Sequence, residues 1–264
     1  MTSAIARLND FGQSPWYDNL ARPLLTGGGL RSLVRDDGIR GVTSNPTILD
    51  KAIDAGDGYD EALAQAASDG LSIEDTYWSV VVDDIQHATD ALRSVYDALG
   101  GADGFVSLEV SPELAHDTAG TVTMARDLFT RVDRPNLMIK IPGTLAGIPA
   151  VEETIASGIN VNVTLIFSVE RHELVIEAYL KGLERLAETG GELSRISSVA
   201  SFFVSRVDTE TDRRLPDDSP LRGKAAVANA KLAYELFRER FAGPRWEALA
   251  ARGARLQRPL WAST

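Results

Sequence analysis

The sequence contains no cysteine and no long apolar segment. Without cysteine the chain can form no disulfide, has no thiol nucleophile and cannot build a thiolate metal site, which is compatible with a cytosolic protein. No stretch of 18 apolar residues occurs, and residues 1–10 lack the apolar segment and cleavage site of a signal peptide. We therefore expect a cytoplasmic protein.

Positive charge and histidine are both scarce. The chain has 27 Lys and Arg against 38 Asp and Glu, a net charge of −11, which argues against general binding to nucleic acid or to anionic membranes. An anionic substrate would need local positive charge. The acidic segment from Asp208 to Asp218 is expected to be a solvated loop. The three histidines lie in or beside predicted helices, so no metal triad and no metal cofactor are expected: His87, His116 and His172.

What the chain has is an alternation of short β-branched runs with longer helical patterns. At 264 residues and 44% hydrophobic content it can bury one large core, so a single domain over residues 1–264 is expected, with no repeat or linker. This alternation is typical of a (β/α)8-type TIM barrel. The predicted strands are 38–43, 105–110, 137–141, 159–166, 196–204 and 260–262. The best predicted helices are 74–99, 118–132, 146–157, 169–189 and 223–241, with Ser168 as an N-cap and Gly190 as part of a stop signal.

Polar residues gather at the ends of the predicted strands. In TIM barrels the chemistry sits where strands end and loops begin. Each residue alone has a structural reading: Asn45 before Pro46 suits a turn, and Glu109 suits a salt bridge to Lys140. Their shared position instead favours a functional basin. The residues are Thr43, Ser44, Asn45, Glu109, Lys140, Asn162, Thr164 and Ser201.

Lys140 lies inside the apolar run 137–144 (LMIKIPGT), which ends at a Pro-Gly pair. A buried ammonium is costly, so this lysine must be paired with an acid, kept neutral by burial, or extended until its head reaches water. A neutral amine is a nucleophile. Lys140 is therefore a candidate for covalent catalysis, although the commoner reading of a lysine in a strand is a stem that covers apolar surface while the head reaches water.

The chain resembles the transaldolases, specifically their longer actinobacterial-type members. The resemblance rests first on GVTSNPT at 41–47 and NLMIKIPGT at 136–144, and it extends over nearly the whole chain in the same order. Further matching segments are GINVNVTLIFS at 158–168, WYDNLAR at 16–22, VSLEV at 106–110, SFFVSRVD at 201–208 and LWAST at 260–264.

The resemblance implies a class I aldol reaction that needs no cofactor and no metal. Lys140 would form a Schiff base with the ketone of a sugar phosphate, and the iminium would accept electrons while the C3–C4 bond breaks. A dihydroxyacetone unit would pass from sedoheptulose 7-phosphate to glyceraldehyde 3-phosphate, giving erythrose 4-phosphate and fructose 6-phosphate in the pentose phosphate pathway.

The resemblance also implies a role for each polar residue. Asp18 would take the proton of the C4 hydroxyl, and Glu109 with Thr164 would position a water. The residues expected to bind substrate are Thr43, Asn45, Asn162, Ser201, Arg206 and Ser263. Two structural alternatives remain open. Asp18 would suit a helix N-cap, and Arg206 would suit a salt bridge to Asp208 or Glu210.

The chain departs from the family pattern at its end. That pattern continues beyond Trp-Ala-Ser-Thr with a glycine, a basic phosphate-binding residue, and an eighth strand and helix, whereas this sequence ends at Thr264. We therefore expect a barrel lacking its last βα unit, with two open strand edges that self-association or a partner would cover.

Three functions are compatible with these features. The first is an active transaldolase, including one with a changed acceptor. The second is an impaired barrel that serves as an assembly partner, in which a lost phosphate contact would weaken substrate binding by about 1.5–3 kcal/mol. The third is an aldolase that hydrolyses the covalent intermediate instead of transferring it.

Overall fold

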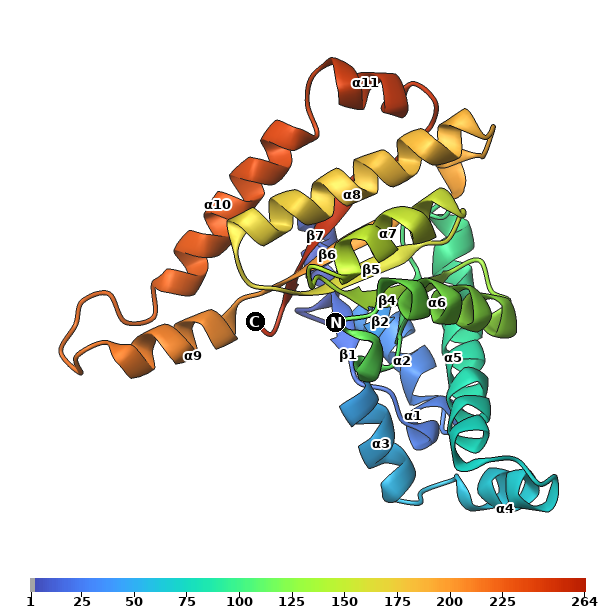
Figure 1. Cartoon of the computed structure of the whole chain (residues 1–264). Helices are drawn as coiled ribbons and strands as arrows, with labels where there is room; N and C mark the ends of the chain where they lie inside the picture. Colours follow the sequence, from blue (N-terminus) through green and yellow to red (C-terminus); the bar gives the residue numbers. More distant parts are fainter. Residues whose placement is uncertain (1–2) are drawn as a thin grey trace. The chain divides into compact units, whose positions relative to one another are not determined.

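The computed structural model describes residues 3–264 as two compact units. Unit 1 comprises residues 3–109 and 127–139, and unit 2 comprises residues 110–126 and 140–264. The strands of the sheet follow one another in chain order, from β1 to β7. Helices alternate with these strands along the chain (Figure 1), as predicted.

Unit 1 contains three complete parallel strands. Their register pairs Asp18 with Thr43 and Thr43 with Ser107, so β1 and β2 end level, whereas β3 continues to Glu109. The elements are η1 (Ala6–Phe11), β1 (Trp16–Asp18), α1 (Arg22–Thr26), α2 (Gly29–Asp37), β2 (Gly41–Thr43), α3 (Pro46–Asp54), α4 (Asp60–Ser68), α5 (Ile73–Ala98) and β3 (Phe105–Glu109).

Gly41 allows β1 and β2 to pair closely. The Trp16 indole lies across Gly41, its partner in the ladder, and a Cβ at Gly41 would come within 2.2 Å of the ring. Trp16 then donates from Nε1 to the Ser14 hydroxyl at 3.0 Å, and Ser14 donates to Asp103 at 2.6 Å. The short strand β1 is therefore fixed by side-chain packing and hydrogen bonds that no hydrophobic period reveals.

Unit 2 contains the rest of the sheet. β5, β6 and β7 pair in parallel, with Asn162 opposite Val199 and Ser201 opposite Leu260. β5 has an irregularity between Val163 and Ile166, where Leu165 takes a φ of 60°. The elements of this unit are η2 (Pro112–Leu114), α7 (Gly147–Ala156), β5 (Val161–Ile166), α8 (Val169–Glu188), η3 (Leu193–Arg195), β6 (Ser198–Phe203), α9 (Ser205–Arg214), α10 (Ala225–Arg240), α11 (Pro244–Ala250) and β7 (Gln257–Ala262).

Two elements have residues in both units. They are α6 (Thr118–Val132) and β4 (Leu137–Pro142). All six residues of β4 are buried. In unit 1 the Val106 N–H donates to the Asn136 carbonyl at 3.0 Å, and in unit 2 the Val110 N–H donates to the Lys140 carbonyl at 3.1 Å. The predicted strand at 137–141 is thereby confirmed, extended by Pro142.

The long helices agree with the prediction to within two residues. α8 begins after Ser168, whose hydroxyl accepts from the Arg171 N–H at 3.2 Å as an N-cap does. α5 begins after Ser72, which accepts from the Asp75 N–H at 3.1 Å. In unit 2, α8 packs against α7 and also contacts α10 and α11 (Figure 1).

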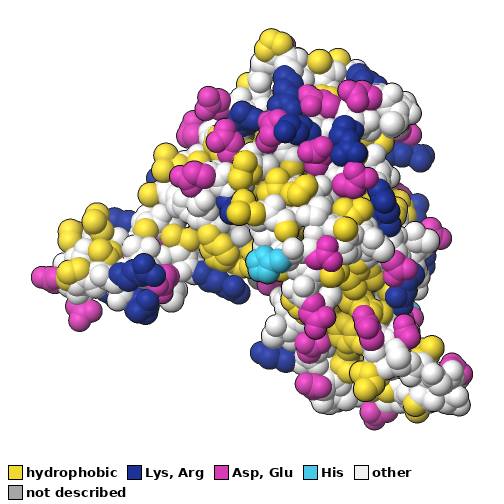
Figure 2. Space-filling view, in the orientation of Figure 1, with side chains coloured by type: hydrophobic (Ala, Val, Ile, Leu, Met, Phe, Trp, Pro, Cys, Tyr) yellow, Lys and Arg dark blue, Asp and Glu magenta, His cyan; other side chains and the backbone are white. Residues whose placement is uncertain are grey.

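Mixed charge covers the surface of α8, α10 and α11. The Arg245 guanidinium donates to Glu177 at 2.8 Å and to Glu184 at 2.7 Å, and Arg240 donates to Glu177 at 2.5 Å. Figure 2 shows basic and acidic side chains interspersed over the upper part of unit 2. These contacts hold the pKa of Glu177 below its usual value, chiefly through the hydrogen bond from Arg245.

The prediction for the acidic segment from Asp208 to Asp218 is wrong in part. Residues 208–214 belong to α9, and a loop follows. α9 has no buried residue and therefore no hydrophobic period to predict it. It is stabilised by pairs three and four residues apart, in which Arg213 and Arg214 both donate to Glu210. These arginines lower the pKa of Glu210 to about 2.

β7 is longer than predicted, since it begins at Gln257 rather than at Leu260. Pro259 obscured its first half, because proline cannot donate to a ladder and is confined to edge strands and strand ends. Here it lies opposite Ala200. No helix within residues 3–264 is long and apolar enough to cross a membrane.

Candidate functional site

Lys140 is a buried lysine in the middle of β4, with 7% of its surface exposed. Successive side chains of a strand point to opposite faces, so Lys140 shares a face with Met138 and Pro142. The neighbours Ile139 and Ile141, on the other face, are fully buried. The Lys140 side chain is therefore largely removed from water within β4.

The turn after Lys140 is held by three hydrogen bonds within unit 2. The Gly143 N–H donates to the Thr164 carbonyl at 2.7 Å. The Thr144 hydroxyl donates to the Ala115 carbonyl at 2.6 Å and accepts from the Gly147 N–H at 2.9 Å. Sequence reasoning did not assign Thr144 a role, although its position directly after a Pro-Gly pair is typical of a turn residue.

Asn162 and Ser201 are brought together by neighbouring strands of unit 2. The Ser201 hydroxyl donates to Oδ1 of Asn162 at 2.7 Å, and both side chains are buried. Oδ1 of Asn162 therefore faces Ser201. Thr164 lies two residues further along β5, on the same face as Asn162, and is also buried.

Arg206 and Ser263 lie on adjacent segments that follow β6 and β7. The Ser205 N–H donates to the Ser263 carbonyl at 2.7 Å, and the two serine hydroxyls are 3.0 Å apart. The Arg206 guanidinium carbon lies 4.9 Å from the centre of the Phe203 ring, a cation–π contact.

The salt bridge suggested as an alternative for Arg206 is not found among the described residues. Asp208 accepts instead from the Ala226 N–H at 2.8 Å, and Glu210 pairs with Arg213 and Arg214. The Arg206 guanidinium therefore keeps donors with which it can bind an anion.

Asp18 and Thr43 meet at the carboxyl ends of β1 and β2 in unit 1. The Thr43 hydroxyl donates to Oδ1 of Asp18 at 2.6 Å. Asp18 is exposed, whereas Thr43 is buried. The N-cap suggested as an alternative for Asp18 is wrong, because α1 begins at Arg22 after Ala21 and has no side-chain cap.

The other unit 1 candidates lie one or two residues beyond a strand or at its last residue. Asn45 is the N-cap of α3, and its Oδ1 accepts from the Ile48 N–H at 3.0 Å. The structural role suggested for Asn45, in the turn before Pro46, is therefore confirmed for its side-chain oxygen. Its Nδ2 group is the part left to meet a substrate. Ser44 is buried and donates to the Ser107 carbonyl at 2.9 Å. Glu109, the last residue of β3, is half-buried.

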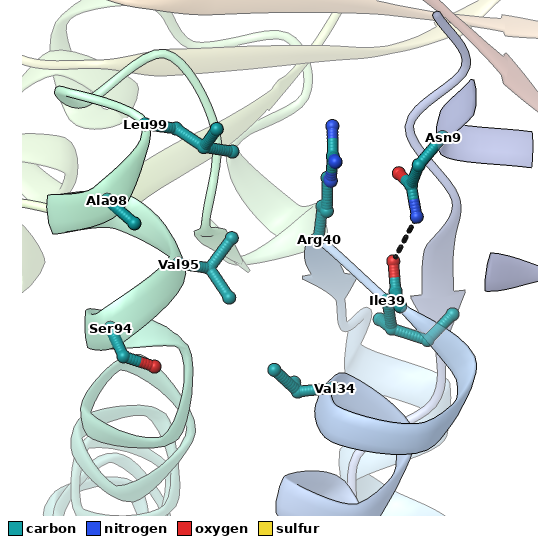
Figure 3. A pocket seen from close by; sticks show the side chains of 9 residues that line it. Asn9, Val34, Ile39, Arg40, Ser94, Val95, Ala98 and Leu99 are labelled. Atoms are coloured by element: carbon teal, nitrogen blue, oxygen red, sulfur yellow. Dashed lines mark hydrogen bonds between the residues drawn. The ribbon is translucent and has the colours of Figure 1, made fainter. Parts of the chain in front are cut away.

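A cleft of about 300 Å³ lies at the other end of β2 in unit 1. It is lined by apolar side chains of α2 and α5, with Arg40 directly before the strand (Figure 3). Asn9 closes one side and donates to the Gly38 carbonyl at 3.0 Å. Because Arg40 precedes β2 whereas Thr43 ends it, this cleft is separate from the residues predicted to act.

The histidines lie away from the strand ends, as predicted. His87 is in α5 and His172 in α8, and His116 lies between η2 and α6. Across residues 3–264, no three side chains among His, Asp and Glu are grouped so that they could hold a metal ion.

Alternating strands and helices, with a buried lysine in a central strand and polar groups at the strand ends, define an α/β enzyme of the TIM-barrel type. Residues 15–262 match the family described as Transaldolase/Fructose-6-phosphate aldolase. Transaldolase 1 of Streptomyces avermitilis is 54% identical over 265 residues, covering 98% of this chain and 70% of the relative. Transaldolase 2 of Streptomyces coelicolor is 53% identical and covers 100% and 72%, and the transaldolase of Thermobifida fusca is 52% identical and covers 100% and 73%.

The chain belongs to the transaldolase and fructose-6-phosphate aldolase family. The resemblance inferred from the strand-end motifs is thereby confirmed, and so is the TIM-barrel-type fold. The curated relatives are longer than this chain, which spans 70–73% of the three named here.

Proposed function

We propose that the protein is a transaldolase that transfers a dihydroxyacetone unit between sugar phosphates through a Schiff base on Lys140. The observation that carries this proposal is a lysine buried in β4, in a chain that shares more than half of its residues with named transaldolases over nearly its whole length. Formation of the Schiff base requires the lysine amine to attack the donor ketone as a nucleophile.

The reaction begins at Nζ of Lys140. This nitrogen attacks the ketone carbon of the donor, and loss of water from the carbinolamine leaves an iminium. When the proton of the C4 hydroxyl is removed, the C3–C4 bond breaks, the aldehyde leaves, and the electron pair moves into the iminium to give an enamine. The enamine then attacks the acceptor aldehyde, and water releases the product and restores the lysine.

We assign the proton transfer at the C4 hydroxyl to Asp18, whose exposed carboxylate is held by Thr43. Glu109 and Thr164 would position the water that enters and leaves during Schiff-base chemistry. Asn45 and Asn162 offer amide donors to substrate hydroxyls, and Ser201 would bind the three-carbon unit. Arg206 and Ser263 would bind the phosphate, since the guanidinium has no acidic partner among the described residues.

The donor and acceptor proposed are those that the family implies, sedoheptulose 7-phosphate and glyceraldehyde 3-phosphate. We also propose a cytoplasmic location, because charged sugar phosphates do not partition into apolar membranes.

Borohydride trapping tests the covalent step. With fructose 6-phosphate and borohydride, peptide mass mapping should find the reduced adduct on Lys140, and Lys140→Arg should abolish both the adduct and turnover. The surface residue Lys181, which pairs with Glu177, provides the control: Lys181→Arg should leave both unchanged. An adduct on another lysine, or no adduct, would refute the assignment.

A product assay separates transfer from simple aldol cleavage. Fructose 6-phosphate is supplied with or without erythrose 4-phosphate, and free dihydroxyacetone is measured. A transaldolase forms sedoheptulose 7-phosphate only when the acceptor is present. It releases little free dihydroxyacetone under either condition. Continuous release of dihydroxyacetone without an acceptor would instead identify an aldolase.

A further inference from the structure

Arg22 is held in unit 1 by the buried pair Tyr59 and Asp84 and by the half-exposed Asp83, to which its Nη2 donates at 2.8 Å. Its Nε donates to Oδ1 of Asp84 at 2.8 Å, and the Tyr59 hydroxyl donates to Oδ2 of the same carboxylate at 2.7 Å. The Tyr59 hydroxyl also accepts from the Arg22 N–H at 3.0 Å. These bonds close a ring through Arg22, Asp84 and Tyr59, which we call the Arg22 clamp.

The Arg22 clamp is almost entirely removed from water. The side chain of Asp84 is 2% exposed and that of Arg22 is 13% exposed, and Tyr59 is fully buried. The guanidinium also lies over the Tyr59 ring, 4.9 Å from its centre. Burial raises the pKa of the Asp84 carboxyl, and the bonds from Tyr59 and Arg22 oppose that rise.

Stability alone does not account for such an arrangement. A buried ion pair returns little free energy relative to apolar side chains of similar volume, because both charges must be desolvated. What the arrangement provides is geometry, since each polar atom of the Asp84 carboxylate and the Tyr59 hydroxyl has a defined partner. These bonds fix the position of Arg22, the first residue of α1.

That residue lies four positions after Asp18. The intervening segment contains Leu20, which is fully buried, so the chain from Asp18 to Arg22 has little freedom. Asp18 is held on the other side by its bond to Thr43. Tyr59 comes from the loop between α3 and α4, and Asn45 is the N-cap of α3. Through Asp84 of α5, the clamp thus ties together the two segments that carry Asp18 and Asn45.

We propose that Arg22, Tyr59 and Asp84 are positioning residues that set the Asp18 carboxylate for proton transfer at the C4 hydroxyl. This inference rests on the proposed function, in which Asp18 is the base. Loosening the clamp slows cleavage of the C3–C4 bond and leaves the formation of the Schiff base on Lys140 unchanged. Misplacement of a catalytic group by about 1 Å can cost about 100-fold in rate.

Tyr59→Phe is the sharpest variant, because it removes the shared hydroxyl and keeps the ring under the guanidinium. Arg22→Lys keeps the positive charge but removes the planar set of guanidinium N–H donors. The matched control is Tyr179→Phe, which removes an equally buried hydroxyl from unit 2, where Tyr179 donates to the Arg255 carbonyl at 2.7 Å. Near-ultraviolet circular dichroism and melting temperature show that each variant is folded.

Two rates are measured with fructose 6-phosphate in single-turnover experiments: borohydride trapping on Lys140 and release of glyceraldehyde 3-phosphate. For Tyr59→Phe and Arg22→Lys we expect the release rate and kcat to fall about 10- to 100-fold, with KM and the trapping rate within about threefold of wild type. For these two variants the acid limb of the pH profile of kcat should shift as well. Tyr179→Phe should change only the melting temperature.

The outcomes distinguish failure of the positioning role from failure of the proposed function. If the clamp variants behave like Tyr179→Phe, losing stability but no rate, the positioning role is wrong and the proposed function stands. If trapping and release fall together, the clamp supports the whole site rather than Asp18, and the inference is overturned. If the wild-type protein gives no adduct on Lys140, the proposed function itself fails.

Discussion

The Thr43 hydroxyl lies 2.6 Å from Oδ1 of Asp18 and donates to it, joining the last residues of β1 and β2. The two residues are also direct partners in the strand ladder. An exposed carboxylate at the end of a three-residue strand is thereby fixed by its neighbour, which is the condition that a general base must meet.

Replacing Thr43 with valine should lower kcat by about tenfold or more. Valine preserves the shape and the burial but removes the hydrogen bond to the carboxylate, and such a bond to a charged group contributes about 1.5–3 kcal/mol. The measurement is steady-state turnover of fructose 6-phosphate with erythrose 4-phosphate. Thr43→Ser keeps the hydroxyl and should retain most of the activity. Equal rates for the two variants would show that the bond to Asp18 is irrelevant to turnover.

The long elements could be predicted from the sequence because their patterns are local. α8 has an apolar face of 3.6-residue period and a serine cap at Ser168, and its predicted range differs from the observed one by a single residue. β4 could be recognised as a short apolar run ended by Pro142 and Gly143. In both cases, residues close in the chain carried all of the information.

The remaining elements depend on contacts between distant residues. β1 is a strand because Trp16 packs on Gly41, 25 positions later. In the Arg22 clamp, Tyr59 and Asp84 lie 37 and 62 positions from Arg22. No local hydrophobic period signals such contacts. The motif at 16–22 therefore predicts a role for Asp18 but none for Arg22.

A methyl group at Gly41 should destabilise the protein strongly. Its Cβ would lie 2.2 Å from the Trp16 ring, so β1 or the indole must shift, and overpacking of this kind costs about 1–3 kcal/mol. Urea unfolding of Gly41→Ala measures the loss. Trp16→Ala and the double variant complete a cycle, in which the cost of the added methyl should largely vanish once the ring is gone. Additive free energies of unfolding would contradict the clash.

Acid should destabilise the protein through His172. This side chain is fully buried in α8, with its ring 5.7 Å from that of Phe202. Neither ring nitrogen has a partner of hydrogen-bond geometry among the described residues, although the Ala233 backbone lies close enough to offset part of the effect of burial. Burial lowers the pKa of His172 from 6.5 to about 4.

The sign follows from which state binds the proton. Between pH 6.5 and about 4 the unfolded chain protonates its histidine and the folded chain does not, so the free energy of unfolding falls as pH falls. Over that interval the loss is about 3 kcal/mol. Denaturant titrations at several pH values should show it in wild type and show a flatter profile in His172→Leu. His87→Leu is the control, because His87 is exposed beside Asp83. Parallel profiles for wild type and His172→Leu would contradict the prediction.

Removing the Arg206 side chain should weaken the binding of phosphorylated substrates selectively. The guanidinium lies over the Phe203 ring, and the acidic residues Asp208 and Glu210 of α9 bind other partners. Arg206 can therefore bind a phosphate without first breaking a salt bridge within α9. Loss of one charge-assisted contact of about 1.5–3 kcal/mol corresponds to a rise in KM of about 10- to 150-fold. The values to compare are those of Arg206→Ala with fructose 6-phosphate and with unphosphorylated fructose, and only the first should change. Arg213→Ala removes a cation from the same helix that is already paired with Glu210, so its KM should match wild type. A rise in KM for both sugars would mean that Arg206 supports the fold of this segment and does not bind the phosphate.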